Sequence, residues 1–251
     1  MQGAYRPKNG EPRVLPIVQS TTYKYDSSVE MGDLFDLKKS GYFYSRLQNP
    51  TNDTVAAKIT MLEGGVAGML TSSGQAANFY AVFNIAQAGD HIVSSSAIYG
   101  GTYNYLEHTF PEFGVTTTFV DPEVDGAFEA AIQDNTKAIF IETLGNPNSN
   151  LIDIEEIAKI AHAHNIPLVV DSTFATPYLV RPIEYGADIV VHSATKFIGG
   201  HGTAIGGVIV DSGNFDWAKS GKFPHLVEPN ASYHGLSLIH ISEPTRRSYI
   251  S

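Results

Sequence analysis

The sequence contains no cysteine, which excludes disulfide bonds, thiolate metal sites and a cysteine nucleophile. It also lacks any run of lysine or arginine. Its 16 lysine and arginine residues are outnumbered by 26 aspartate and glutamate residues, which gives a net charge of -10. This charge disfavours a nucleic-acid footprint and a basic membrane-binding face. No stretch reaches the ~18 uncharged apolar residues of a membrane span, and the N-terminus lacks the apolar region of a signal peptide. We therefore expect a cytoplasmic protein whose partners are small molecules rather than nucleic acid or membrane.

Short apolar runs that are rich in β-branched residues recur along the chain. They occupy residues 67–72, 90–95, 116–121, 137–143, 167–172, 187–193 and 206–211. Helical patterns at residues 74–89, 126–135 and 152–165 alternate with several of these runs. This alternation predicts an α/β fold with a mostly parallel sheet and helices on both faces, in which ligands gather at the carboxyl ends of the strands. Residues 1–40 lack the alternation and predict an extended arm that ends in a short helix.

Three features lie where predicted strands end. Lys196 follows the run at 187–193, and Asp171 lies at the end of the run at 167–172. The spacing between them suits a single crossover, so both side chains are expected on neighbouring strands at one edge of the sheet. The third feature, TSSGQAA at 71–77, leads from a strand into a helix whose free N–H groups can bind an anion. Each feature also has an ordinary interpretation, as a solvated lysine, a helix-capping aspartate and a plain strand-to-helix turn.

Taken together, the three features match the chemical needs of pyridoxal 5'-phosphate. This cofactor requires an amine that condenses with its aldehyde, a carboxylate that holds its pyridine nitrogen protonated, and donors for its phosphate. Lys196 and Asp171 supply the first two, and the helix start at Gly74 can supply the third. The hydroxyl groups of Ser193 and Thr195 flank the lysine and can reach the same phosphate.

Six stretches carry a family resemblance: YSRLQNPT (44–51), TSSGQAA, AIYGGTY (97–103), ETLGNPN (142–148), VDSTFATPYL (170–179) and SATKFIGGHG (193–202). In order and at family-like spacing, they resemble the cystathionine gamma-synthase family of Cys/Met-metabolism enzymes. The resemblance implies the large domain of the aspartate-aminotransferase-like (type I) fold over residues 41–235, after the arm at 1–40. It also implies that the C-terminal small domain of such enzymes is absent.

The resemblance further implies roles for individual residues. Lys196 is the Schiff-base lysine, Asp171 the partner of the pyridine nitrogen, and Tyr99 the residue that stacks on the cofactor ring; these three form the expected catalytic set. Tyr44 and Arg46 reach the phosphate of a neighbouring subunit, which implies a homodimer or homotetramer. The complete expected cofactor-binding set is Tyr44, Arg46, Ser73, Gly74, Gln75, Tyr99, Asn146, Asp171, Ser193, Thr195 and Lys196.

Within the family, YGGTYNYLEHTFPEFGV and the stretch at 213–235 are most similar to the O-acetylhomoserine sulfhydrylase branch. The implied reaction is a gamma-replacement on O-acetyl-L-homoserine with sulfide or a thiol, giving homocysteine or methionine. A methionine or cystathionine gamma-lyase and a cystathionine gamma-synthase are the alternatives. Gly101 disfavours the methionine gamma-lyase, which usually carries a cysteine at this place. A non-catalytic homologue that binds pyridoxal phosphate, or an inactive fragment, is the alternative from another class.

Two other patterns resemble a dinucleotide-binding motif and a metal-binding histidine pair, but their spacing does not fit either site. The glycines in GGHGTAIGG (199–207) are spaced one residue too widely for a dinucleotide fingerprint, and a strand rather than a helix is expected to follow them. His162 and His164 are two residues apart on a predicted helix and therefore point to different faces. We interpret both histidines as cations near a helix C-terminus and expect no metal site.

Both the alternation and the family resemblance stop at Leu236. The final stretch, LSLIHISEPTRRSYIS (236–251), resembles the in-frame translation of a transposase-type sequencing-library adapter. We therefore interpret residues 236–251 as an adapter-derived foreign tail, and we expect it to pack poorly and to lie exposed.

Overall fold

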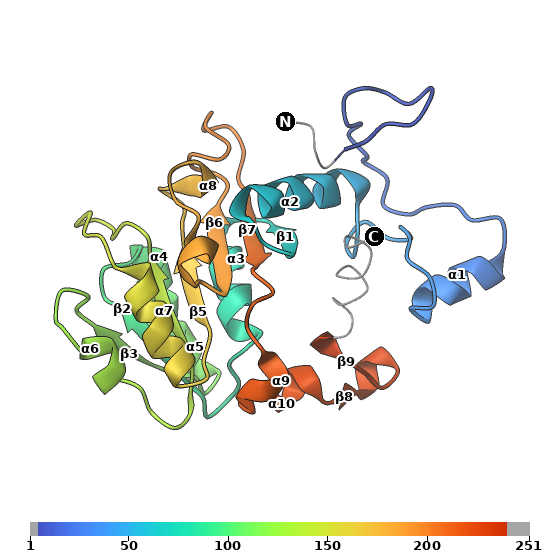
Figure 1. The fold of residues 1–251 in the computed structure, drawn as a ribbon. Coiled ribbons are helices and arrows are strands. Elements are labelled where there is room, and N and C mark those ends of the chain that lie inside the picture. The colour runs from blue at the N-terminus through green and yellow to red at the C-terminus, as the bar shows by residue number, and fades with distance from the viewer. Residues whose placement is uncertain (1–4, 240–251) are drawn as a thin grey trace.

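The structure is a computed structural model that describes residues 5–239. Its centre is a seven-stranded sheet with the order β1-β7-β6-β5-β4-β2-β3 (Figure 1). The strands are β1 (Ala67–Thr71), β2 (His91–Ser95), β3 (Thr116–Val120), β4 (Thr136–Glu142), β5 (Leu168–Asp171), β6 (Ile189–Ser193) and β7 (Gly207–Asp211). Each coincides with one of the predicted apolar runs, so the strand predictions are confirmed.

The sheet is mostly parallel, as predicted. The pairs β2/β3, β2/β4, β4/β5 and β5/β6 are parallel, whereas β7 pairs antiparallel with both β1 and β6. Six strands therefore share one direction, and their carboxyl ends lie along one edge of the sheet. We call this edge the carboxyl edge. In the register of β4 and β5, Glu142 lies opposite Asp171 at this edge.

The helices begin and end at residues that suit helix termini. Asn49 caps α2, which has Pro50 in its first turn and ends at Gly64 with a φ of 82°. The α-helices are α1 (Ser28–Phe35), α2 (Pro50–Glu63), α3 (Gly74–Phe83), α4 (Gly100–Asn104), α5 (Phe110–Glu112), α6 (Ala127–Ala130), α7 (Ile154–Ala163), α8 (Thr176–Leu179), α9 (Trp217–Ser220) and α10 (Pro224–Val227). A π-helical turn covers Tyr105–Thr109, and 3-10 turns cover Pro182–Tyr185 and Ala231–Tyr233. In the described residues, no helix is long and apolar enough to cross a membrane.

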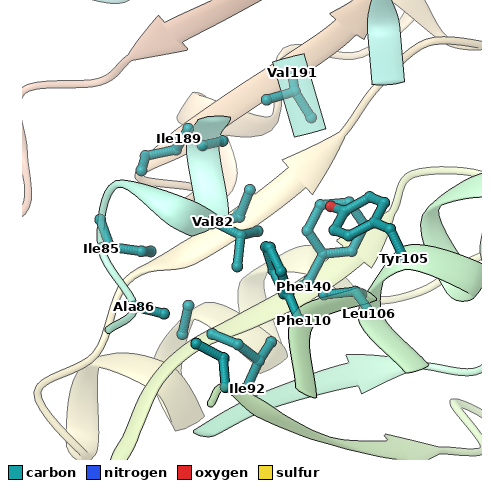
Figure 2. Packing of buried hydrophobic residues seen from close by; sticks show 14 of the residues in the cluster. Val82, Ile85, Ala86, Ile92, Tyr105, Leu106, Phe110, Phe140, Ile189 and Val191 are labelled. Carbon is teal, nitrogen blue, oxygen red and sulfur yellow. The ribbon is translucent and has the colours of Figure 1, made fainter. Parts of the chain in front are cut away.

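Helices cover both faces of the sheet, which confirms the layered α/β prediction. Consecutive residues of β5 alternate between two apolar clusters: Val169 lies in the cluster of α3, and Leu168 and Val170 lie in that of α7 and α2. Figure 2 shows the first cluster, in which Val82 of α3 and Phe140 of β4 come together with neighbouring side chains. The central strands β4 and β5 are thus buried on both faces, and their carboxyl ends carry the polar residues Glu142 and Asp171.

One predicted helix is much shorter than expected. The pattern at 126–135 forms only the four residues of α6. After α6, the main-chain N–H of Gln133 donates to Thr136 Oγ1, and the Asn135 side chain donates to the Gly89 carbonyl. Hydrogen bonds from such side chains compete with helix formation, so the chain turns toward β4 instead.

The arm runs over residues 5–40, passes the start of α2 and reaches away from the sheet to α1 (Figure 1). Thr51 Oγ1 fixes it at the start of α2, where it accepts from the Val18 N–H and donates to the Pro16 carbonyl. These bonds attach the arm to the domain, and the boundaries of 1–40 and 41–235 stay predictions.

The last described residues pack against the domain. The strands β8 (Pro229–Asn230) and β9 (Leu236–Ser237) pair antiparallel, Ser237 is buried, and Leu238 and Ile239 pack against the cluster of α3. The expectation that the tail lies exposed holds for Leu236, which is 42% exposed, and is wrong for residues 237–239. Ser237 is buried, and the apolar side chains of Leu238 and Ile239 find partners in this cluster. Residues 240–251 lie outside the described residues, and the adapter interpretation stays a prediction.

Candidate functional site

The predicted residues Asp171, Ser193 and Lys196 lie close in the topology. Asp171 ends β5, Ser193 ends the neighbouring parallel strand β6, and Lys196 follows Ser193 in a tight turn. The structure thus places Asp171 and the turn that carries Lys196 at adjacent strand ends on the carboxyl edge, as the spacing predicted. Parallel strands position such residues well, because ligands bind where the strand ends leave the sheet.

The carboxylate of Asp171 is held on both oxygens. It is 7% exposed, its Oδ1 accepts from the N–H and the hydroxyl of Thr173, and its Oδ2 accepts from Asn78 Nδ2 at 2.9 Å. Thr173 Oγ1 also accepts from the main-chain N–H of Ser193 at 2.8 Å. Thr173 therefore connects the ends of β5 and β6 and fixes the carboxylate relative to the turn that carries Lys196.

Sequence reasoning missed three residues that contact Asp171 or adjoin it: Asn78, Thr173 and Glu142. Asn78 lies one helical turn after Gly74 and so shares its face of α3. Thr173 stands two residues after Asp171, the spacing at which an aspartate accepts a local hydrogen bond. Glu142 lies at the end of a predicted strand, as Asp171 does, and this position is the sequence feature that could have identified it.

The start of α3 provides main-chain donors. Ser73 caps the helix by accepting the Ala76 N–H at 3.0 Å, and the N–H groups of Gly74 and Gln75 have no partner within the described residues. A Cβ at Gly74 would lie 2.4 Å from the Cβ of Ser193, so only glycine permits the close approach of α3 to the end of β6. This arrangement can receive an anion at the carboxyl edge.

The hydroxyl groups on the turn after β6 differ in how they are engaged. Thr195 Oγ1 donates to the Gly206 carbonyl at 3.2 Å and accepts the Gly206 N–H at 3.1 Å. Ser193 contributes its N–H to Thr173, and its hydroxyl has no partner within residues 5–239. The Lys196 side chain is exposed and makes no ion pair with any described residue. Because the Thr195 hydroxyl already donates to and accepts from Gly206, it would have to give up these partners to bind an anion.

The predicted aromatic residue Tyr99 lies at the same edge. Its main-chain N–H donates to Glu142 Oε1 at 2.7 Å, and its ring is 52% exposed. The Gln75 side chain donates to the Gly101 carbonyl at 3.0 Å, which connects the start of α3 to the segment after Tyr99. Asn146 follows β4 in a half-buried loop. The exposed Tyr99 is thus held at the carboxyl edge, next to the end of β4 and the start of α3.

Tyr44 and Arg46 contact one another, and Tyr44 contacts the arm. The Arg46 guanidinium sits 5.3 Å from the centroid of the Tyr44 ring, and Tyr44 forms an isolated bridge with Thr22 of the arm. No hydrogen bond or ion pair joins either side chain to the carboxyl edge within the described part of the chain. The structure describes one chain, so the expected contact with a neighbouring subunit stays a prediction.

Burial gives Glu142 an unusual electrostatic state. The pKa of this carboxyl group is raised from 4.5 to about 8. Burial is the largest cause, the negative charge of Asp171 adds to the increase, and the hydrogen bond from the Tyr99 N–H opposes both effects. At neutral pH the Glu142 carboxyl therefore holds a proton, while its neighbour Asp171 keeps the hydrogen bonds that suit an anion.

This raised pKa predicts how Glu142→Gln changes stability. Between pH 4.5 and about 8 the folded chain retains a proton that the unfolded chain has lost, so wild-type stability falls as pH rises through this window. Glutamine has no such proton, and the stability of the variant relative to wild type should rise by up to about 1.4 kcal/mol per pH unit. Urea unfolding of both chains without cofactor, at several pH values across this window, measures the difference. A difference that stays constant with pH contradicts the assignment.

The two histidines of α7 have separate partners. His162 Nε2 lies 2.8 Å from Asp188 Oδ2, a hydrogen bond that raises the histidine pKa, and His164 Nε2 lies 3.6 Å from Glu129 Oε1. Both stand in the last turn or at the end of α7, as predicted. Within the described residues, no group of three or more His, Cys, Asp or Glu side chains is arranged to hold a metal ion.

Comparisons with known proteins agree on one family. The profile of the Cys/Met metabolism PLP-dependent enzymes matches residues 2–236. The homocysteine synthase of Schizosaccharomyces pombe is 52% identical over 226 residues, which is 89% of this chain and 53% of that protein. The O-acetyl-L-homoserine sulfhydrylase of Leptospira meyeri is 49% identical over 224 residues, 89% of this chain and 50% of that protein. The chain thus spans about half the length of the curated relatives it matches.

A solved structure extends the comparison to three dimensions. The Campylobacter jejuni protein described as an O-acetylhomoserine (thiol)-lyase superposes with a TM-score of 0.92 at 36% identity, covering 98% of this chain and 62% of that one. That crystal structure contains N'-pyridoxyl-lysine-5'-monophosphate.

Proposed function

Because the chain belongs to the family of Cys/Met metabolism PLP-dependent enzymes, we propose that it forms part of an enzyme that replaces the acetate of O-acetyl-L-homoserine with sulfide or a thiol. The products would be homocysteine or methionine. The observation that carries this proposal is the buried carboxylate of Asp171, which accepts hydrogen bonds on both oxygens and lies beside the turn of Lys196. The choice of substrate is supported by relatives that are about 50% identical and are named homocysteine synthase and O-acetyl-L-homoserine sulfhydrylase.

The described residues fit pyridoxal 5'-phosphate. Asp171 presents a fixed carboxylate, Lys196 an amine without an ion-pair partner within the described residues, and the start of α3 two free N–H groups. The close approach of Gly74 to Ser193, which a Cβ would prevent, keeps these N–H groups next to the end of β6. When bound, the cofactor supplies an aldehyde for amines and a ring that accepts electron density.

The residues of this chain would orient and polarise that group. Asp171, held by Asn78 and Thr173, would keep a proton on the pyridine nitrogen. Lys196 would hold the cofactor and, once free, move protons as a general base and acid. Tyr99 would cover one face of the ring. Phosphate contacts are proposed for Ser73, Gly74, Gln75, Ser193 and Thr195, and a contact beside the ring hydroxyl for Asn146.

A feature at Gly101 favours the sulfhydrylase over a methionine gamma-lyase. A Cβ at this position would lie 2.5 Å from Tyr99 Cε1 and 3.0 Å from Gln75 Oε1. A cysteine at position 101 would therefore displace the Tyr99 ring from its observed place. The observed place of the Tyr99 ring therefore depends on glycine at position 101.

The activity test needs a chain of the length of its relatives. We propose joining residues 1–235 to the C-terminal half of the Leptospira meyeri sulfhydrylase, which replaces the proposed foreign tail at 236–251. The chimera is expected to turn over O-acetylhomoserine with sulfide faster than it cleaves methionine or cystathionine. Preferred cleavage of either amino acid would support a lyase instead. A chimera whose cofactor spectrum does not change with any amino acid would support a non-catalytic homologue.

The proposed subunit contact predicts complementation between inactive variants. If Tyr44 and Arg46 bind the phosphate in a partner subunit, an Arg46→Ala chimera mixed with a Lys196→Ala chimera should regain activity, because hybrid dimers contain one intact site. Arginine suits this role because its fork binds phosphate with two hydrogen bonds. Activity is measured after subunit exchange has been verified with differently tagged chains. Absence of rescue would mean that Arg46 acts within its own chain.

A further inference from the structure

Glu142 makes a specific contact with the main chain at Tyr99. Its side chain is 4% exposed, and Oε1 accepts the Tyr99 N–H at 2.7 Å. Tyr99 is the residue before α4, and no side chain caps that helix. The hydrogen bond from the Tyr99 N–H to Glu142 therefore determines where the main chain turns into α4, and it thereby fixes the point from which the exposed Tyr99 side chain projects.

The surroundings of Glu142 favour an uncharged carboxyl group. Asp171 lies opposite it on β5 and is the charged group that acts on it. On the other side of β4, the strand β2 ends in Ser94 and Ser95, which carry no charge, and Tyr99 contributes only its N–H. Two buried carboxylates this close cannot both ionise cheaply, and Asp171 has the donors that stabilise an anion. The carbonyl oxygen of a protonated Glu142 still accepts the Tyr99 N–H.

We propose that Glu142 is a positioning residue whose buried carboxyl group fixes the main chain at Tyr99, and thereby the Tyr99 ring, at the cofactor site. This inference rests on the proposed function, because it gives Tyr99 its place beside pyridoxal phosphate. It assigns no proton transfer to Glu142. The role requires the hydrogen-bond acceptor at this place and not its charge.

A double-mutant cycle on cofactor binding tests the inference in the 251-residue chain. Glu142→Leu should weaken binding of pyridoxal 5'-phosphate about tenfold, the effect of one lost hydrogen bond that orders a contact. Glu142→Gln keeps the acceptor oxygen and should bind within about threefold of wild type. In a Tyr99→Ala background, Glu142→Leu should have no further effect, because the residue through which it acts is gone. Binding is followed by the absorbance of the cofactor.

A control and a second variant separate positioning from loss of structure. Thr136→Val removes a buried hydrogen-bond acceptor at the opposite end of β4, so it should lower stability and leave cofactor affinity unchanged. Glu142→Asp keeps the acid but is one methylene shorter, so it should lose the Tyr99 contact and weaken binding about tenfold even if Glu142→Leu does not fold.

The outcomes distinguish this inference from the function on which it rests. A full tenfold effect of Glu142→Leu in the Tyr99→Ala background would overturn the positioning role, and so would a Glu142→Gln chain as impaired as Glu142→Leu. Wild-type binding with unaffected leucine and aspartate variants overturns the inference alone. A wild-type chain that does not bind pyridoxal phosphate overturns the proposed function and, with it, this inference.

Discussion

Lys196→Ala is expected to lower turnover of O-acetylhomoserine in the chimera by about 10³-fold or more, the scale seen when a covalent nucleophile is removed. The structural reason is the position of Lys196, on the turn directly after β6 and beside the end of β5 that carries Asp171. No described side chain competes for its ammonium in an ion pair. Steady-state kinetics with O-acetylhomoserine and sulfide measures the loss.

Two further variants make the Lys196 result specific. Lys196→Arg preserves the positive charge, but a guanidinium does not release its proton in proteins, so this variant should be as inactive as the alanine variant. Lys159→Ala removes an exposed lysine of α7 that pairs with Glu155, and it should retain wild-type turnover. An active Lys196→Arg chain would mean that position 196 contributes charge and not an amine.

Asp171→Asn should have the second large effect, a loss of about 10²-fold in turnover while cofactor binding stays measurable. An uncharged amide cannot hold a proton on the pyridine nitrogen as a carboxylate does. The structure adds a second reason, because Asn78 and Thr173 both donate to Asp171. The amide nitrogen of asparagine would have to face one of these donors, so its orientation would also be disturbed.

A matched control for this variant lies at the opposite edge of the sheet. Asp188 is also buried, and it accepts from the Leu168 N–H and contacts His162. Asp188→Asn should lower stability without a comparable change in turnover per folded chain. If Asp171→Asn turned over substrate at the wild-type rate, Asp171 would not be the partner of the pyridine nitrogen.

The strands and the two central site residues were predictable from sequence because both follow from local patterns. Apolar runs of strand length define the sheet, and the direction of successive strands then puts Asp171 and Lys196 at one edge without further information. The short α6 was not predictable, because one of the competing hydrogen bonds joins Asn135 to Gly89, 46 positions earlier in the chain.

The contacts of Asn78 with Asp171 and of Glu142 with Tyr99 could not be inferred from sequence for a similar reason. Asn78 on α3 meets Asp171 on β5 across the packed layer, 93 positions apart in the chain. Glu142 and Tyr99 are 43 positions apart and meet through the order of β4 in the sheet. Neither pair has a spacing that marks it, and only the packing of helix on sheet creates these contacts.

The most direct test of the central claim is to locate the lysine that binds the cofactor. The 251-residue chain is incubated with pyridoxal 5'-phosphate, reduced with borohydride, digested and mapped by mass spectrometry. The account predicts a pyridoxyl group on Lys196 and its loss from the map in Lys196→Ala. A pyridoxyl group found on Lys137 or Lys159, with Lys196 unmodified, would contradict it.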